Sequence, residues 1–252
     1  HLLTAKEPLI RTRPFRAPHH TVSVQALTGG GRRPKPGEIS LATGGILFLD
    51  EFPEFSRAAL ETLRQPLEER EVTVSRVEAS VTYPATFQLV AAMNPCPCGH
   101  FPDRSRCRCT DGQITRYLQK VSGPMLDRID ICVEASPITY GDIRSSGNNE
   151  SSREIRARVE QARKIQGERF AGENIRCNGE MSGRHIRKFC GLGREEEKFM
   201  EEIFKKLALS ARMHDRILKV ARTTADLAEE EKIRLADLCE AVSYVKTRDK
   251  FW

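Results

Sequence analysis

Short apolar runs and alternating segments mark the first half of the chain, and longer amphipathic segments mark the second. The run Ile46–Leu49 lies between a glycine pair and two acids, which is typical of a strand buried on both faces of a sheet. Residues 86–93 and 128–133 form two further apolar runs, and we expect them to be strands of the same sheet. The pattern predicts an α/β fold with a largely parallel sheet.

A helix and a hairpin are predicted between the first two of these strands. Residues 56–69 have helical periodicity, with Ser56 as the N-cap and Pro66 as a residue that kinks or ends the last turn. Residues 71–76 and 79–83 alternate between apolar and polar side chains, so we expect two antiparallel strands there.

The second half of the chain is predicted to be helical. A turn at Pro137 and a polar linker over residues 145–152 precede it. The expected helices cover residues 152–170, 182–190, 194–207, 211–227 and 232–245. We therefore expect two domains: an α/β core over residues 1–137, which also holds a short helix at 113–120, and a small helical domain over residues 138–252.

Composition narrows the function only slightly. The chain has 41 Lys and Arg against 35 Asp and Glu, and a net charge of +6 allows an anionic partner without demanding one. No apolar run approaches the roughly 18 residues that span a membrane, and the N-terminus lacks the layout of a signal peptide. The scattered cysteines indicate buried thiols in the reducing cytoplasm: Cys132, Cys177, Cys190 and Cys239.

The other four cysteines have a regular spacing. Cys96 and Cys98 form one Cys-x-Cys pair, Cys107 and Cys109 form another, and a short basic loop separates them. Two such pairs suit a tetrahedral Zn²⁺ site, and because four thiolates leave no open position, the metal is expected to be structural. Two disulfides are the alternative, which a reducing compartment disfavours. Replacement of one cysteine ligand by His100 is a further alternative.

Polar residues that suit nucleotide chemistry follow the first two predicted strands. Asp50 and Glu51 end the first, where open α/β sheets bind their ligands. One acid would hold Mg²⁺, and the other would polarise the water that attacks the γ-phosphate of ATP. Asn94 ends the second strand, where its amide would orient that water or touch the γ-phosphate. The alternatives are a solvated acidic turn and an Asx turn before Pro95.

Two arginines extend this constellation. Arg128 begins the third predicted strand, and it would act as an arginine finger on the nucleotide of a neighbouring subunit. Arg212 opens a helix of the second domain and would reach phosphate, although a cation there opposes the helix dipole. Seen alone, each arginine is better explained as a surface charge. The order of acid pair, asparagine, arginine and helical-domain arginine favours an ATP site.

With these motifs, the chain resembles AAA+ ATPases of the magnesium-chelatase-like group, and most closely the ComM/YifB type. The resemblance covers nearly the whole chain and is carried by Arg13–Thr21, Pro36–Ala42, Gly45–Phe55, Ala91–Gly99, Ser122–Asp130 and Arg216–Thr223. It implies an AAA+ core of the P-loop type followed by a small all-α lid. It also implies these roles: Walker B pair for Asp50 and Glu51, sensor 1 for Asn94, arginine finger for Arg128, sensor 2 for Arg212, and an insertion after sensor 1 for the four cysteines.

The resemblance also implies a nucleic-acid partner. Residues 29–35 and the hairpin at 71–86 match two insertions of this group, and related hexameric motors place such insertions in the central pore. The basic residues expected to contact the DNA backbone are Arg32, Arg33, Lys35, Arg70 and Arg76. Ordinary basic loops are the alternative. ComM members are similar to hexameric branch-migration helicases, which implies a self-assembling DNA-remodelling motor.

One departure from the family pattern concerns the phosphate-binding loop. The chain contains no Gly-x-x-x-x-Gly-Lys-Ser/Thr segment. In the family that loop precedes the point where this chain starts, so we expect an N-terminally truncated core that binds ATP weakly and does not hydrolyse it. Two other functions stay open: a chelatase motor subunit that drives metal insertion, and a zinc-stabilised interaction module without ATPase activity.

Overall fold

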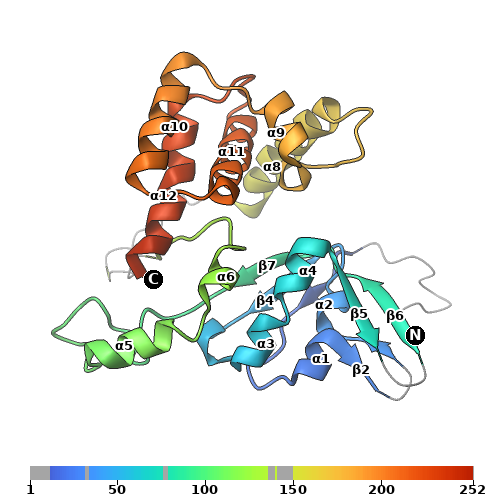
Figure 1. Ribbon diagram of the computed structural model, residues 1–252, viewed down its shortest axis with the longest axis vertical. Helices are drawn as coiled ribbons and strands as arrows, with labels where there is room; N and C mark the ends of the chain where they lie inside the picture. The colour runs from blue at the N-terminus through green and yellow to red at the C-terminus, as the bar shows by residue number, and fades with distance from the viewer. Residues whose placement is uncertain (1–11, 32–33, 76–78, 136–139, 141–149, 252) are drawn as a thin grey trace. The chain divides into compact units, whose positions relative to one another are not determined.

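The computed structural model describes residues 12–31, 34–75, 79–135, 140 and 150–251. The chain divides into two compact units, one of which contains residues up to Ile129, while the other runs from Asp130 to Lys250 (Figure 1). In the described ranges, no helix combines the length and the apolar character that a membrane crossing requires.

The first unit is built on a parallel three-stranded sheet. Its strands are β1 (Phe15–Arg16), β4 (Ile46–Leu49) and β7 (Gln88–Ala91), in the order β1-β4-β7. Leu47 and Leu49 of the central strand are fully buried, as the apolar run predicts. The expected parallel sheet and its first two predicted strands are thus confirmed.

The prediction of a third strand over residues 128–133 is wrong. These residues form neither helix nor strand. Among the described residues, β7 is an edge strand that pairs only with β4, and an extended segment becomes a strand only by hydrogen bonding to a neighbour. Ile129 packs against the core, whereas Ile131 and Val133 are 51% and 73% exposed. Of these three apolar residues, only Ile129 contributes to the core, and the run does not form a buried strand.

The predicted helix over residues 56–69 is present in two pieces, α3 (Arg57–Glu61) and α4 (Arg64–Glu69). Ser56 is the N-cap, and its Oγ accepts a hydrogen bond from the Ala59 N–H at 3.2 Å. Pro66 was expected to disturb the last turn, but the break comes one turn earlier. Its ring clashes with the carbonyl of the residue four positions before it, which is Thr62.

The predicted hairpin is confirmed as β5 (Glu71–Ser75) and β6 (Ser80–Pro84), which pair antiparallel. A smaller ladder joins β2 (Gly29–Gly30) to β3 (Lys35–Pro36), and the short helices α1 (Val24–Thr28) and α2 (Glu38–Leu41) flank it in sequence. Tyr83 of the hairpin donates a hydrogen bond to the Pro34 carbonyl at 2.9 Å. This bond ties the hairpin to the loop of the small ladder.

Two helices follow the sheet strands in the first unit, α5 (Asp111–Leu118) and α6 (Gly123–Leu126). The first corresponds to the helix predicted over residues 113–120. It begins two residues earlier because Thr110 and Gln113 form a capping box.

In the described part of the second unit, every regular element is a helix, as predicted (Figure 1). Its helices are α8 (Ser152–Arg169), α9 (Gly183–Phe189), α10 (Arg194–Lys206), α11 (Ala211–Leu227) and α12 (Leu235–Phe251), with a short turn η2 (Asn178–Glu180). Ile217, Leu218 and Ala221 of α11 are buried in its core. The apolar face of α11 therefore organises this unit.

A buried polar network lies beside that core. Asp226 is fully buried, and its carboxylate accepts hydrogen bonds from Arg169, Arg222 and Asn178. Arg222 is only 3% exposed, and it also donates to the carbonyls of Glu230 and Glu231. Because both arginines and the amide find partners, the buried charges are compensated.

Candidate functional site

Two successive carboxylates stand at the carboxyl end of the central strand. Asp50 and Glu51 follow β4 directly, and Glu51 has a left-handed backbone with φ 53° and ψ 44°. The Glu51 N–H donates to Oδ1 of Asp50 at 2.9 Å. A left-handed conformation is costly for a residue with a side chain. Here it starts the turn η1 (Phe52–Glu54), whose Phe52 N–H donates to the Ala92 carbonyl at 3.0 Å and holds the turn against the next strand.

A histidine from the neighbouring strand reaches this turn. His20 follows β1, and its Nδ1 lies 2.8 Å from Oε2 of Glu51. Its ring lies beside the His19 ring, tilted by 35° with 4.0 Å between centroids, and meets the Phe55 ring edge-on. The sequence pattern alone predicts no role for His20. The available signal was the histidine pair after a short strand, and it becomes informative only once β1 is known to lie beside β4.

Asn94 lies at the same edge of the sheet, on the other side of β4. Leu49 pairs with Ala91 in the parallel register, and the Ala92 N–H donates to the Leu49 carbonyl at 3.0 Å. Asn94 therefore follows β7 close to where Asp50 follows β4, and its side chain is exposed. The structure brings the acid pair, His20 and Asn94 to one edge of the sheet, from three neighbouring strands.

The two predicted arginines have different surroundings. Arg128 is paired within its own unit: its Nη2 lies 2.6 Å from Oε1 of Glu68, a second N–H donates to the Pro124 carbonyl, and the side chain is 11% exposed. Arg212 is exposed in the first turn of α11, just after the N-cap Ser210, in the second unit.

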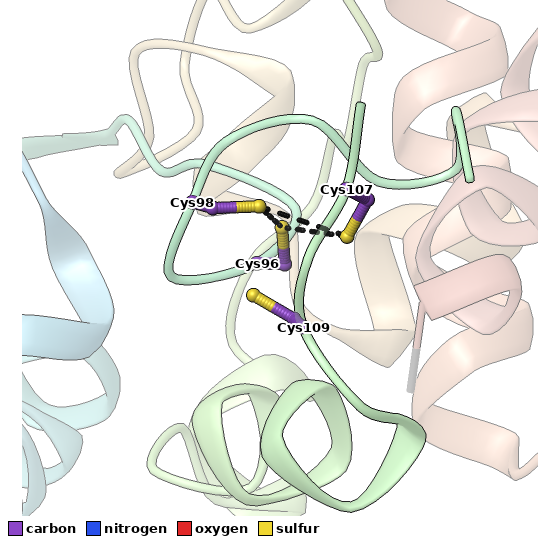
Figure 2. A group of neighbouring side chains, drawn as sticks. All are labelled: Cys96, Cys98, Cys107 and Cys109. Carbon is purple, nitrogen blue, oxygen red and sulfur yellow. Dashed lines mark hydrogen bonds between the residues drawn. The ribbon is translucent and has the colours of Figure 1, made fainter. Parts of the chain in front are cut away.

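The four paired cysteines converge in space (Figure 2). Their Sγ atoms all lie within 4.8 Å of one another, and those of Cys96, Cys98 and Cys107 are 3.4, 3.6 and 3.8 Å apart. Four sulfurs bound to one Zn²⁺ at about 2.3 Å would lie about 3.8 Å from one another in a tetrahedron. Disulfide sulfurs would lie about 2 Å apart, so these four are free thiols. The group contains Cys96, Cys98, Cys107 and Cys109 and no histidine.

The backbone around this group stabilises thiolates. The His100 N–H lowers the pKa of Cys98 to about 6, and the Phe101 N–H donates to Sγ of Cys96 at 3.4 Å. Desolvation raises the pKa of Cys109 to about 11, because removal from water disfavours the charged thiolate. The donor set and its backbone N–H groups fit a tetrahedral divalent metal ion.

The predicted nucleic-acid residues are only partly described. Lys35 and Arg70 are exposed, and Arg70 caps α4 in a left-handed conformation. The other three predicted contacts lie outside the described residues: Arg32, Arg33 and Arg76. The Tyr83–Pro34 hydrogen bond joins the segment that contains Lys35 to the hairpin that begins directly after Arg70.

Comparison with known proteins places both halves of the chain in one family. Residues 2–143 match the family model described as magnesium chelatase, subunit ChlI, and residues 149–245 match its C-terminal counterpart. An α/β core of AAA+ type followed by an all-α region agrees with this match.

Several bacterial proteins are similar over most of the chain. Competence protein ComM of Haemophilus influenzae is 48% identical over 235 residues, which is 93% of this chain and 45% of the relative. The uncharacterized protein YifB of Escherichia coli is 47% identical over 93% of this chain and 46% of its own length. Rv2897c of Mycobacterium tuberculosis is 40% identical over 98% of this chain. The chain spans about half the length of the curated relatives it matches. It belongs to the magnesium chelatase subunit ChlI family.

Proposed function

We propose that the full-length protein is an AAA+ ATPase in which Asp50 and Glu51 carry the chemistry of hydrolysis. The observation that supports this most is the position of two successive carboxylates directly after β4, where the left-handed backbone of Glu51 starts a turn, at the sheet edge that also holds Asn94. Asp50 would hold Mg²⁺, which would neutralise charge developing on the phosphates. Glu51 would polarise the attacking water, and Asn94 would orient it or contact the γ-phosphate.

His20 would orient Glu51 within this site. The 2.8 Å contact between Nδ1 and Oε2 fixes one oxygen of the carboxylate and leaves the other available to a water molecule. His20 would therefore act through Glu51 and would not itself touch the nucleotide. A hydrogen bond that holds a general base in one orientation contributes to the rate through positioning.

The two arginines would complete the site in an assembled ring. Arg128 would serve a neighbouring subunit, for which it must exchange its ion pair with Glu68 for phosphate. Arg212 would contact phosphate from the helical unit. Within these 252 residues there is no Gly-x-x-x-x-Gly-Lys-Ser/Thr cradle. The 252-residue chain alone would therefore bind ATP weakly and would not hydrolyse it.

DNA is the proposed substrate of the motor. Support comes from the exposed Lys35 and Arg70 on two segments that Tyr83 ties together, and from the likeness to a relative named as a competence protein. The cysteine group would bind a structural Zn²⁺ beside this machinery. A chelatase motor that drives metal insertion is the second candidate, favoured by the description of the matching family.

ATPase assays of the full-length protein separate these functions. ATP turnover would be measured for the protein without additions, with forked DNA, and with a porphyrin and Mg²⁺. DNA binding would be measured over a series of salt concentrations, with and without ATP. The DNA motor predicts turnover stimulated by forked DNA and binding that weakens as salt rises. Absence of DNA binding at low salt would contradict it. Absence of ATP turnover under all three conditions would contradict the proposal of an ATPase. A zinc-stabilised interaction module would then be the function that agrees with the data.

A further inference from the structure

The short helix α6 lies directly before Arg128. It contains four residues, Gly123–Leu126, and its C-cap Asp127 is followed by Arg128, whose main-chain N–H donates to the Met125 carbonyl at 3.0 Å. Helix formation is cooperative, and a single turn has almost no stability of its own. The position of the Arg128 backbone therefore depends on the contacts that hold α6.

Helices α3 and α4 contact α6 and the residue after it at both ends. At the start of α6, the Ser122 hydroxyl donates to Oε1 of Glu61 at 2.5 Å and accepts the capping hydrogen bond from the Met125 N–H at 3.3 Å. Beyond its end, the Arg128 side chain pairs with Glu68 at 2.6 Å. The first carboxylate belongs to α3 and the second to α4, so both come from one continuous stretch of chain.

The Glu61 carboxylate is itself fixed through both oxygens. Its Oε2 accepts a hydrogen bond from Nη1 of Arg64 at 2.7 Å, while Oε1 accepts the one from Ser122. The Ser122 hydroxyl and the Arg64 guanidinium lower the pKa of Glu61, so the carboxylate is charged at pH 7. A hydrogen bond to a charged acceptor is roughly twice as strong as a neutral one. The Glu61–Ser122 hydrogen bond is therefore a firm anchor for the start of α6.

The two contacts differ in whether they use the Arg128 side chain. In the proposed function Arg128 acts at the nucleotide of a neighbouring subunit, and its guanidinium must then leave Glu68. The Glu61–Ser122 hydrogen bond involves neither Arg128 nor Glu68, so it persists after that exchange. It would keep α6 and the Arg128 backbone in place while the arginine side chain moves.

We propose that Glu61 and Ser122 are positioning residues for Arg128, and that their hydrogen bond fixes the helix from which Arg128 reaches the γ-phosphate bound by a neighbouring subunit. The proposal rests on the proposed ATPase function, in which Arg128 is the arginine finger. Glu61 and Ser122 themselves contact no substrate. An arginine held within reach of the γ-phosphate stabilises the transition state, and a loosened helix lowers the fraction of time that the arginine spends there.

The test measures ATP hydrolysis by full-length Ser122→Ala and Glu61→Ala, each alone and combined with Arg128→Ala. Each single variant should lower kcat about tenfold, which corresponds to the lower end of the range for a hydrogen bond to a charged group. The Kd for ADP should stay unchanged because ADP has no γ-phosphate.

The combined variants separate positioning from stability. In the Arg128→Ala background, neither Ser122→Ala nor Glu61→Ala should lower the rate of hydrolysis further by more than about twofold, because no arginine is left to position. Single-turnover assays with radiolabelled ATP resolve the slow hydrolysis expected of these proteins.

Two further variants serve as controls. Ser122→Thr keeps a hydroxyl that can cap α6 and bond Glu61, so it should retain most of the wild-type kcat. Ser151→Ala removes the N-cap serine of α8, whose hydroxyl likewise accepts the Glu154 N–H at 3.3 Å and donates to the Glu154 carboxylate at 2.8 Å. It makes the same chemical change in the other unit and should keep kcat within about twofold of wild type.

Several outcomes would overturn the proposal. Wild-type kcat in either Ser122→Ala or Glu61→Ala would show that their hydrogen bond does not position Arg128. A tenfold loss that recurs in the Arg128→Ala background, or a similar loss in Ser151→Ala, would assign the effect to stability. Wild-type kcat in Arg128→Ala would remove Arg128 from the reaction, and the inference would fail while the ATPase stands. Absence of turnover in wild type would contradict the proposed function, and the inference with it.

Discussion

His20 Nδ1 lies 2.8 Å from Glu51 Oε2, so a residue that follows β1 holds a carboxylate that follows β4. The two residues are 31 positions apart in sequence, and the parallel pairing of β1 with β4 brings them together. This contact lies at the sheet edge where α/β proteins bind ligands. The contact links His20, for which the sequence predicted no role, to Glu51, on which the proposed hydrolysis depends.

Substitution of His20 tests this link. In the full-length protein, His20→Ala should lower kcat for ATP hydrolysis about tenfold or more, because a hydrogen bond to a charged group contributes about 1.5–3 kcal/mol. Nucleotide affinity should change little, since His20 acts through Glu51. Steady-state kinetics with a direct nucleotide-binding measurement would separate the two effects.

His19→Ala is the matched control for that experiment. The His19 ring bonds Thr21 at 2.9 Å instead of the acid pair, so most of the activity should remain. Equal losses in the two variants would mean that the loop as a whole, and not the His20–Glu51 contact, supports turnover.

The metal centre can be tested by its stoichiometry. Purified protein should contain about one Zn²⁺ per chain, and Cys107→Ser should lose most of it because a four-thiolate site has no spare ligand. Elemental analysis by mass spectrometry measures both. Cys239→Ser removes an exposed thiol outside the group and should keep full stoichiometry. Full zinc content in Cys107→Ser would refute the ligand set.

The buried network of the helical unit should control its stability. Asp226→Ala leaves Arg169 and Arg222 without their buried carboxylate, and breaking such a pair costs about 3–5 kcal/mol. Chemical denaturation followed by circular dichroism would report the change in the free energy of unfolding. Glu201→Ala removes a surface partner of Lys205 and should cost less than about 1 kcal/mol. Similar losses in both variants would contradict the assignment of Asp226 as the centre of the network.

Nucleic-acid contact through the joined basic loops has a quantitative signature. Each of Lys35→Ala and Arg70→Ala should weaken binding of forked DNA by the full-length protein and reduce the slope of log K against log salt by about 0.9 or less. Lys205→Ala alters a cation of the helical unit that pairs with Glu201, and it should leave that slope unchanged. An unchanged slope in both loop variants would remove these residues from the DNA interface.

Local patterns predicted the elements of this fold well, because burial and capping are encoded within each segment. The strand Ile46–Leu49, the hairpin and the helices of the second unit are examples. Patterns failed where the outcome depends on a distant neighbour. Residues 128–133 have the apolar content of a strand but no described strand pairs with them.

In the candidate site, too, locally encoded features could be predicted and contacts between distant residues could not. The carboxylates at 50 and 51 and the four cysteines could be predicted because their spacing along the chain already matches their chemistry. His20 was missed since its partner lies on another strand. The ion pair between Arg128 and Glu68 could not be predicted either, because no pattern near one residue in the sequence points to the other as its partner.

ATP turnover by full-length Glu51→Gln is the most direct test of the central claim. The substitution keeps the size of the side chain but removes the base, so kcat should fall by about 10² or more while nucleotide binding persists. Glu54→Gln, three residues later, breaks an exposed ion pair with Lys120 and should retain most activity. Wild-type turnover in Glu51→Gln would contradict the assignment of hydrolysis to the carboxylates after β4.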